Sequence, residues 1–176
     1  MKNIIIPVSG GKDSQACVAL AVDQYGAENC LGIHQHTGFD HKLTYEHMDY
    51  MRDRYQLEIR DIKSTKYSTV PELMVGEGIM PTRHARACTK LLKIVPWFKW
   101  LKDQPNKDTI LVLMGMRAAE GVHRRKNYGH RIDAETYEMG DVSSECPKSC
   151  KLVKVQLPIV QWSPPGVFEF LKKRGG

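Results

Sequence analysis

Several features are missing from this chain of 176 residues, and each absence narrows what the protein can be. No apolar run approaches the roughly 20 residues that a membrane-spanning helix needs, which excludes a transmembrane protein. The start of the chain, Met1-Lys2-Asn3 before a short apolar run, lacks the pattern of a secretory signal peptide. Without a secretory signal, the odd count of five cysteines favours reduced thiols over a disulfide framework. We therefore expect a cytoplasmic protein with no membrane partner.

The chain also lacks internal repeats and low-complexity segments, and its bulk properties are those of an ordinary globular protein. Hydrophobic residues make up 41% and charged residues 26% of the sequence. Because a chain of this length can bury one sizeable core, we expect a single domain over residues 1–176. The formal net charge of +6 fits polyanionic partners, either nucleotides or nucleic acid, although a solvated basic face has the same composition.

The chain is organised around a glycine-rich loop between an apolar run at residues 4–8, which predicts a strand, and a helical run at residues 18–25. The loop, called the phosphate loop below, reads Ser9-Gly10-Gly11-Lys12-Asp13-Ser14. Adjacent glycines let the backbone approach an anion, and a helix N-terminus favours negative charge. Lys12 adds a cation, Ser9 and Ser14 add hydroxyl groups, and Asp13 and Ser14 are suitable N-cap residues. The spacing is not that of a Walker A motif, so the loop is predicted to be a phosphate site of another type. The alternative is an ordinary glycine-rich turn that binds no ligand.

Apolar runs alternate with helical patterns along the rest of the chain, which predicts an α/β three-layer sandwich around a mainly parallel, doubly wound sheet. We expect further strands at residues 30–36, 57–62, 109–114 and 151–159, and further helices at residues 44–55, 70–77 and 167–171. The polar stretch 124–145 is predicted to be a long loop or a short hairpin around Tyr137. Since such sheets bind ligands at the carboxyl ends of their strands, the loop beginning His36-Thr37-Gly38 should face the phosphate loop.

A second informative stretch is basic. Arg83, Arg86, Lys90 and Lys93 recur at intervals of three or four residues, so a helix would place them on one face. That face suits phosphate or sulfate binding, and the same basic setting would favour the thiolate form of Cys88. A surface helix with a solvated basic side is the alternative.

The strand predicted at residues 109–114 leads into a segment that combines glycine, arginine and glutamate. Gly115 would let a ligand approach the backbone. Guanidinium groups bind phosphate in a bidentate manner, so we expect Arg117 and Arg124 to contact phosphates, with Glu120 orienting one of them.

Three cysteines lie in segments that the fold should bring towards the ligand. Cys146 and Cys150 form a Cys-x3-Cys pair, a spacing that gives only weak support to a zinc site. Together with Cys88 they would either hold an iron–sulfur cluster with one open position or remain structural thiols.

Five segments follow the order found in one known family: residues 9–14, 36–45, 86–96, 115–124 and 158–171. Together they resemble the phosphoadenosine phosphosulfate (PAPS) reductase-like group of the PP-loop ATP pyrophosphatase, or adenine nucleotide alpha hydrolase, superfamily. The sequence departs from that family in three places. His36 stands where the family usually has Asp, Gly121 replaces a Ser, and no Glu-Cys-Gly tail with a cysteine nucleophile is present.

The resemblance implies an enzyme of sulfur-linked nucleotidyl chemistry, which either reduces a sulfonucleotide or cleaves ATP between its α- and β-phosphates. It implies catalytic roles for Lys12 and Arg117. Cys88 is a further catalytic candidate because of its basic setting, and it does not stand at the family's catalytic position. The bound nucleotide, ATP or PAPS, would contact Ser9, Gly10, Gly11, Lys12, Asp13, Ser14, His36, Thr37, Gly38, Gly115, Arg117 and Arg124, and a further substrate would contact Arg83, Arg86, Lys90 and Glu120. Asp13 would help to hold Mg²⁺, and Cys88, Cys146 and Cys150 a [4Fe-4S] cluster.

Two other functions stay open at this point. A nucleic-acid sulfuration enzyme would adenylate its nucleic-acid substrate and deliver sulfur through Cys88, Cys146 and Cys150. A nucleotide-binding accessory protein would bind ATP or PAPS without turnover. The resemblance also allows a sulfur-donor or thioredoxin-like partner protein, and a homodimer.

Overall fold

The computed structural model describes residues 2–80, 87–133 and 135–175. Its centre is a six-stranded sheet with the strand order β3-β2-β1-β4-β6-β5. The strands are β1 (Ile4–Val8), β2 (Cys30–Gln35), β3 (Ile59–Ile62), β4 (Leu111–Leu113), β5 (Thr136–Glu138) and β6 (Lys154–Gln156). Every neighbouring pair is parallel except β5 and β6. The mainly parallel α/β sheet predicted from the alternating sequence pattern is thereby confirmed.

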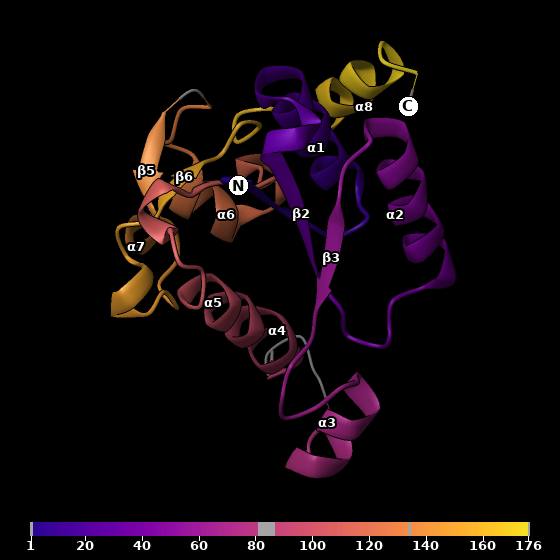
Figure 1. Cartoon of the computed structure of the whole chain (residues 1–176), viewed down its shortest axis with the longest axis vertical. Coiled ribbons are helices and arrows are strands. Elements are labelled where there is room, and N and C mark those ends of the chain that lie inside the picture. The colour runs from indigo at the N-terminus through magenta and orange to yellow at the C-terminus, as the bar shows by residue number, and fades with distance from the viewer. Residues whose placement is uncertain (1, 81–86, 134, 176) are drawn as a thin grey trace.

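Helices pack on both faces of this sheet (Figure 1). One face carries α1 (Lys12–Tyr25) and α2 (Lys42–Tyr55), with α8 (Pro164–Lys172) docked on α1; the other carries α5 (Val95–Lys102) and α7 (Met139–Val142). Side chains alternate along β1 accordingly, because Ile5 packs with the α5 side whereas Ile4 and Ile6 pack with the α1 side. The α3 helix (Val70–Glu77) lies at one end of the molecule, away from the sheet (Figure 1).

The order of the strands determines where a ligand crevice forms. From β1 the chain passes outward to β2 and β3, and then returns to place β4 on the opposite side of β1. Because β1 and β4 are parallel neighbours, the segments that follow them begin at the same edge of the sheet. From there the two segments continue in opposite directions. Such a switch point is where open α/β sheets bind ligands.

The basic stretch forms a helix whose middle turn is wider than an α-helical turn. It begins with α4 (Ala87–Thr89), continues through the π-helical segment η2 (Lys90–Ile94) and ends in α5. The Val95 N–H donates to the Lys90 carbonyl, a spacing of five residues. Pro96 follows and explains the change of pitch, since it has no N–H and its ring would clash with the carbonyl four residues earlier.

The stretch predicted to be a loop or hairpin contains more regular structure than its sequence suggests. It holds part of α6 (Val122–Tyr128), then β5 and α7. Residues 122–127 of α6 are all exposed, so the helix has no apolar stripe that a periodicity search could detect. The remaining short turns are η1 (Ala27–Asn29), η3 (Lys107–Thr109), η4 (Ala118–Glu120) and η5 (Lys148–Cys150). Within the described ranges, no helix is both long and apolar enough to cross a membrane.

Candidate functional site

The helix that follows β1 begins without a side-chain cap. Its N-cap is Gly11, whereas α2, α3 and α8 begin at His41, Thr69 and Ser163, whose side chains accept hydrogen bonds from their own first turns. The expectation that Asp13 or Ser14 caps α1 is wrong, because both lie inside the first turn. The first N–H groups of a helix have no intrahelical acceptor, so the start of α1 is available to an anion.

The glycines hold the phosphate loop in a shape that other residues would strain. Gly10 has φ +73°, and a Cβ added there would lie 2.6 Å from Cγ2 of Thr44 in the first turn of α2. Gly11 is exposed, and of the atoms that the structure describes a Cβ there would meet only Ser9 Oγ, at 3.6 Å. The Ser14 hydroxyl is buried and donates to the Gly11 carbonyl at 2.8 Å. One side of the loop is therefore packed against α2, while the backbone at Gly11 stays open to a ligand.

A buried ion pair joins this loop to the segment after β4. Nε and Nη2 of Arg117 donate to Oδ1 and Oδ2 of Asp13 at 2.8 and 3.0 Å, and the arginine is only 3% exposed. Its remaining Nη1 is buried without a partner among the described residues. The expected direct contact between Arg117 and phosphate does not fit this burial. The guanidinium instead orients Asp13 and with it the start of α1.

Gly115 has a different use from the one expected. A Cβ added there would lie 2.7 Å from the carbonyl oxygen of Asp13 and 3.3 Å from Cβ of Cys17. The close approach that this glycine permits is therefore that of α1, and the protein's own backbone takes the place expected for a ligand. Gly115 and Arg117 thus act together to fix α1 beside the end of β4.

Lys12 lies where the phosphate loop meets α2 and α8. Its Nζ is 3.2 Å from Oδ2 of Asp13 and 5.7 Å from the centre of the Phe168 ring. A cavity of about 520 Å³ opens at this point, lined by Gly10, Lys12, Gln15, Leu43, Thr44, His47, Phe168, Leu171 and Lys172. Phe168 and His47 were not among the predicted site residues, because no motif in the sequence connects either of them with Lys12.

The loop after β2 lies beside the phosphate loop, as the sheet topology requires. Thr37 is 5% exposed, and its hydroxyl donates to Asp40 Oδ2 at 2.7 Å while accepting the Phe39 N–H at 3.3 Å. Gly38 has φ +65° and packs against Thr69. Thr37 and Gly38 therefore shape the loop itself. His36 is half-buried, and its Nδ1 lies 3.4 Å from the Tyr45 hydroxyl of α2.

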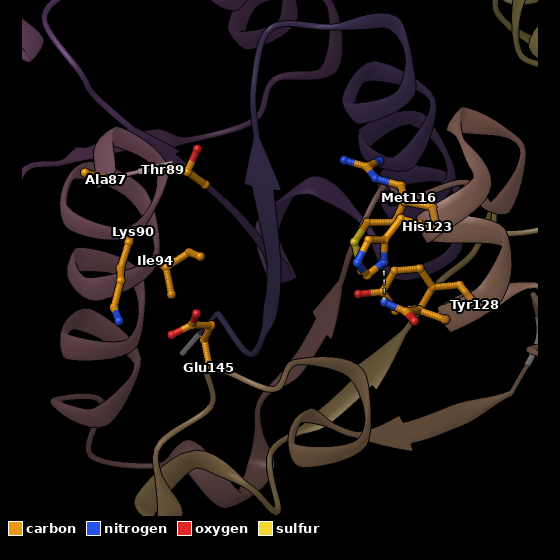
Figure 2. Close-up of a pocket in the computed structure, with 10 residues that line it drawn as sticks. Ala87, Thr89, Lys90, Ile94, Met116, His123, Tyr128 and Glu145 are labelled. Atoms are coloured by element: carbon orange, nitrogen blue, oxygen red, sulfur yellow. Dashed lines mark hydrogen bonds between the residues drawn. The ribbon is translucent and has the colours of Figure 1, made fainter. Parts of the chain in front are cut away.

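A larger cavity, of about 670 Å³, separates the α4–η2 segment from α6. Figure 2 shows Thr89, Lys90 and Ile94 on one wall, with Glu145 below them, and Met116, His123 and Tyr128 on the other wall. We call it the acceptor cavity below. Arg83 and Arg86, expected on the same basic face as Lys90, lie outside the described residues.

Arg124 also lines the acceptor cavity, on the α6 wall. Its guanidinium pairs with the Glu120 carboxylate, which in turn accepts the backbone N–H of Arg117 at 3.4 Å. Arg117 and Arg124, which the sequence analysis grouped together, therefore point to different places, with Glu120 as the link between them. Three residues that line this cavity were not predicted from the sequence: His123, Tyr128 and Glu145. His123 and Asn127 are hydrogen-bonded and lie four residues apart on α6. This spacing places two polar side chains on one face of a helix, and it is the sequence signal that could have predicted the α6 wall.

The described residues contain no group of three or more His, Cys, Asp or Glu side chains placed to hold a metal ion. All five cysteines are free; Cys150 is buried in the core, Cys146 packs against the same core, and Cys88 is half-buried on α4. The described residues therefore do not bring Cys88, Cys146 and Cys150 together in the way that the expected iron–sulfur site requires. Asp13 does not fit a Mg²⁺ ligand in this arrangement either, because both of its oxygens already contact cationic groups.

Burial affects the chemistry of the thiols. It raises the pKa of Cys30 and of Cys146 to about 11, and it raises the pKa of Cys17 further still. These three thiols are therefore protonated at neutral pH, which makes them poor nucleophiles.

Comparisons with known proteins agree with this geometry. No curated protein sequence matches the chain. In fold, the chain is similar to a PAPS reductase from Candida auris, solved as a phosphate complex, with a TM-score of 0.65 and 13% identity over 99% of this chain and 74% of that one. It is also similar to the U34-tRNA thiolase NcsA from Methanococcus maripaludis, solved with its [4Fe-4S] cluster (TM-score 0.59, 14% identity, 98% of this chain and 57% of that one).

A third similar structure is the glutamine-dependent NAD+ synthetase from Acinetobacter baumannii in complex with ADP. Its TM-score is 0.56 at 19% identity, over 98% of this chain but only 28% of that one. At these identities the likeness shows the fold alone. The model of the phosphoadenosine phosphosulfate reductase domain, in contrast, matches residues 3–175 of the sequence, almost its whole length. The chain therefore belongs to the phosphoadenosine phosphosulfate reductase domain family.

Proposed function

We propose that the protein binds an adenine nucleotide with its phosphates at the start of α1, and that it cleaves ATP between the α- and β-phosphates. The observation that carries the proposal is the uncapped N-terminus of α1, held open at the switch point of the sheet. Two contacts fix it in place, the packing of Gly10 on Thr44 and the ion pair of Asp13 with Arg117. A rigid set of N–H donors stabilises phosphate charge without reorganisation during the reaction.

The residues around the loop have separate roles in this reaction. The first N–H groups of α1 and the Lys12 ammonium would bind the β- and γ-phosphates, whose charge increases as the α–β bond breaks and pyrophosphate leaves. Asp13 and Arg117 position that N-terminus and do not contact the nucleotide. An acceptor that attacks the α-phosphorus would lie in the acceptor cavity, where Lys90 and Arg124 supply positive charge.

The thiols favour ATP cleavage over the reduction of a sulfonucleotide. Reduction requires a thiolate that attacks sulfur, and burial keeps Cys17, Cys30 and Cys146 protonated at neutral pH. Cys88, on the helical segment that lines the acceptor cavity, is the remaining candidate for sulfur chemistry. We do not propose the cluster-dependent form of nucleic-acid sulfuration, because the described residues do not bring three thiols together. A cytoplasmic location forms part of the proposal and is supported by the five free cysteines.

The test combines binding with product analysis. Isothermal titration of ATP and of PAPS should show that Lys12→Ala weakens nucleotide affinity by about tenfold or more, since it removes a charged phosphate contact. The matched control is Lys102→Ala, which removes an exposed lysine at the end of α5 and should leave the affinity unchanged.

Pyrophosphate release from ATP is then measured beside sulfite release from PAPS, with candidate acceptors present. Pyrophosphate without sulfite supports the proposed reaction, and sulfite without pyrophosphate overturns it in favour of reduction. Tight binding with neither product overturns the catalytic part and leaves an accessory binding protein. Equal nucleotide affinities of the Lys12→Ala variant and the unmodified protein would overturn the proposed site.

A further inference from the structure

Arg131, between α6 and β5, is a buried cation without a counter-charge. It is 7% exposed and takes part in no ion pair with a described residue. Nη2 donates to the backbone carbonyl of Asp141, and the guanidinium carbon lies 4.5 Å from the centre of the Tyr137 ring. Its Nε is buried with no hydrogen-bond partner among the described residues. The proposed reaction makes no use of this residue.

The arrangement is unfavourable for the protein alone. A guanidinium group stays charged at any pH that a protein tolerates, so Arg131 cannot lose its charge on burial as a lysine can. A carbonyl dipole and an aromatic ring offset only part of the desolvation of a full charge. Arg117, which is also buried, shows the usual solution, because a carboxylate takes two of its N–H groups. Arg131 has no such carboxylate partner among the described residues.

A polar hollow of about 490 Å³ adjoins this side chain. Arg131 lines it together with Lys126, His130, Asp141, Ser143 and Ser144. Lys126 and His130 are exposed and have no ion-pair partner among the described residues, and the serine hydroxyl groups are further donors. Asp141 is the single carboxylate among these residues; it is exposed, and its backbone carbonyl holds Arg131. Donors from α6 and from the segment after α7 therefore surround a space large enough for a small anion.

We propose that this hollow is a second anion site, separate from the phosphate loop, and that it binds a tetrahedral oxoanion such as inorganic phosphate or sulfate. The ligand would pair with the part of the Arg131 guanidinium that lines the hollow and with Lys126, and it would accept a hydrogen bond from His130. Tetrahedral oxoanions fit because they offer several acceptor oxygens to donors from different directions. The proposal does not depend on nucleotide binding at α1, since none of these residues lines the Lys12 cavity.

The test observes Arg131 directly. The protein is labelled with ¹⁵N-arginine and carries Lys12→Ala, so that the phosphate loop does not compete for the anion. Sodium phosphate, sodium sulfate and sodium chloride are titrated at matched ionic strength while the Arg131 Nε–Hε signal is followed by NMR; Arg131→Gln assigns the signal. A saturable shift with phosphate and sulfate, but not with chloride, is the expected result. An unchanged signal, or the same shift with chloride, overturns the proposal.

A second variant avoids any folding defect caused by Arg131→Gln. Lys126→Gln combined with His130→Gln changes only exposed side chains and leaves Arg131 in place. We expect it to raise the apparent Kd for phosphate by about tenfold or more, since it removes the lysine charge and a second hydrogen-bond donor. The control is Lys102→Gln, which should leave the Kd unchanged. If the double variant binds phosphate as tightly as the control, the residues that line the hollow do not form the site.

Discussion

At the scale of single residues, the Asp13–Arg117 ion pair is the contact on which the phosphate loop depends most. Asp13→Asn keeps the shape of the side chain but leaves the buried guanidinium without its counter-charge. We expect the free energy of unfolding to fall by about 3–5 kcal/mol, the usual cost of breaking a buried pair from one side. Urea unfolding followed by circular dichroism measures this value.

The control for that experiment removes both charges. Asp13→Asn combined with Arg117→Met eliminates the unpaired cation, so it should recover part of the stability lost in the single Asp13 variant. The single variant Arg117→Met completes the comparison. If the losses of unfolding free energy in Asp13→Asn and Arg117→Met add up to the loss in the double variant, the two side chains are not coupled and the assigned role of Arg117 is wrong.

Gly115 and Gly121 offer a matched pair of substitutions in the same segment. A Cβ at Gly115 would lie 2.7 Å from the Asp13 carbonyl oxygen, so Gly115→Ala must push α1 away from the end of β4. A Cβ added at Gly121 would meet no atom of the described residues within 4 Å, so Gly121→Ala should be accommodated without strain. We expect Gly115→Ala to destabilise the fold by about 1–3 kcal/mol, as overpacking does, and also to weaken ATP binding. Equal thermal stability and equal affinity of the two variants would show that the close packing is unimportant.

At the scale of helices and strands, the sequence predicts best where its pattern is strongest. The β-branched run at 4–8 and the helical pattern at 70–77 have the same bounds in the structure as in the sequence analysis. The α6 helix was missed because it is almost wholly exposed. The strand β5 lies in the stretch predicted as a loop or a hairpin around Tyr137, but its antiparallel partner is β6, which lies outside that stretch. The phosphate loop was recognisable because all its residues are adjacent in sequence. Asp13 pairs with Arg117, and Lys12 lies over the ring of Phe168. Both partners come from distant segments of the sequence, which only the folded chain brings together.

The α8 helix shows how a cap supports the site from a distance. The Ser163 side chain accepts the Gly166 N–H at 3.2 Å, and Val167 and Leu171 pack against Ala16 of α1. Ser163→Ala should lower the free energy of unfolding by about 1 kcal/mol, because it leaves the first turn of α8 uncapped. Ser68→Ala is the control, since the Ser68 hydroxyl makes no hydrogen bond with the described residues and its loss should change stability little. Urea unfolding compares the two variants, and equal values would argue against the cap.

At the scale of the whole molecule, the phosphate loop lies at the point where the two halves of the sheet meet. The β1–β3 side supplies the loop and α2, and the return to β4 supplies Gly115 and Arg117. One cavity adjoins the loop at Lys12, and the acceptor cavity lies beside the segment after β4. In the proposed reaction, the nucleotide would occupy the cavity at Lys12 and the acceptor would occupy the other cavity, so that the attacking atom approaches the α-phosphorus from that side.

The stability of the whole fold should fall at alkaline pH because of its buried thiols. An ordinary thiol in the unfolded chain has a pKa near 9.0, whereas burial raises the pKa of Cys30 and of Cys146 to about 11 in the folded protein. Between these values the unfolded chain loses protons that the folded protein retains, so rising pH favours unfolding. Below about pH 8 both states hold their thiol protons, and these groups contribute no pH dependence.

The expected slope is up to about 1.4 kcal/mol of unfolding free energy per pH unit for each thiol, with the larger shares from the fully buried Cys17 and Cys30. Urea unfolding under reducing conditions, at several values from pH 7 to pH 10.5, measures it. Cys30→Ala also leaves a small cavity and lowers stability at every pH, so the slope between pH 9 and pH 10.5 is the informative quantity. That slope should be smaller in the variant than in the unmodified protein, because one thiol no longer releases a proton on unfolding. Parallel curves for the two proteins would show that Cys30 is not the source of the alkaline sensitivity.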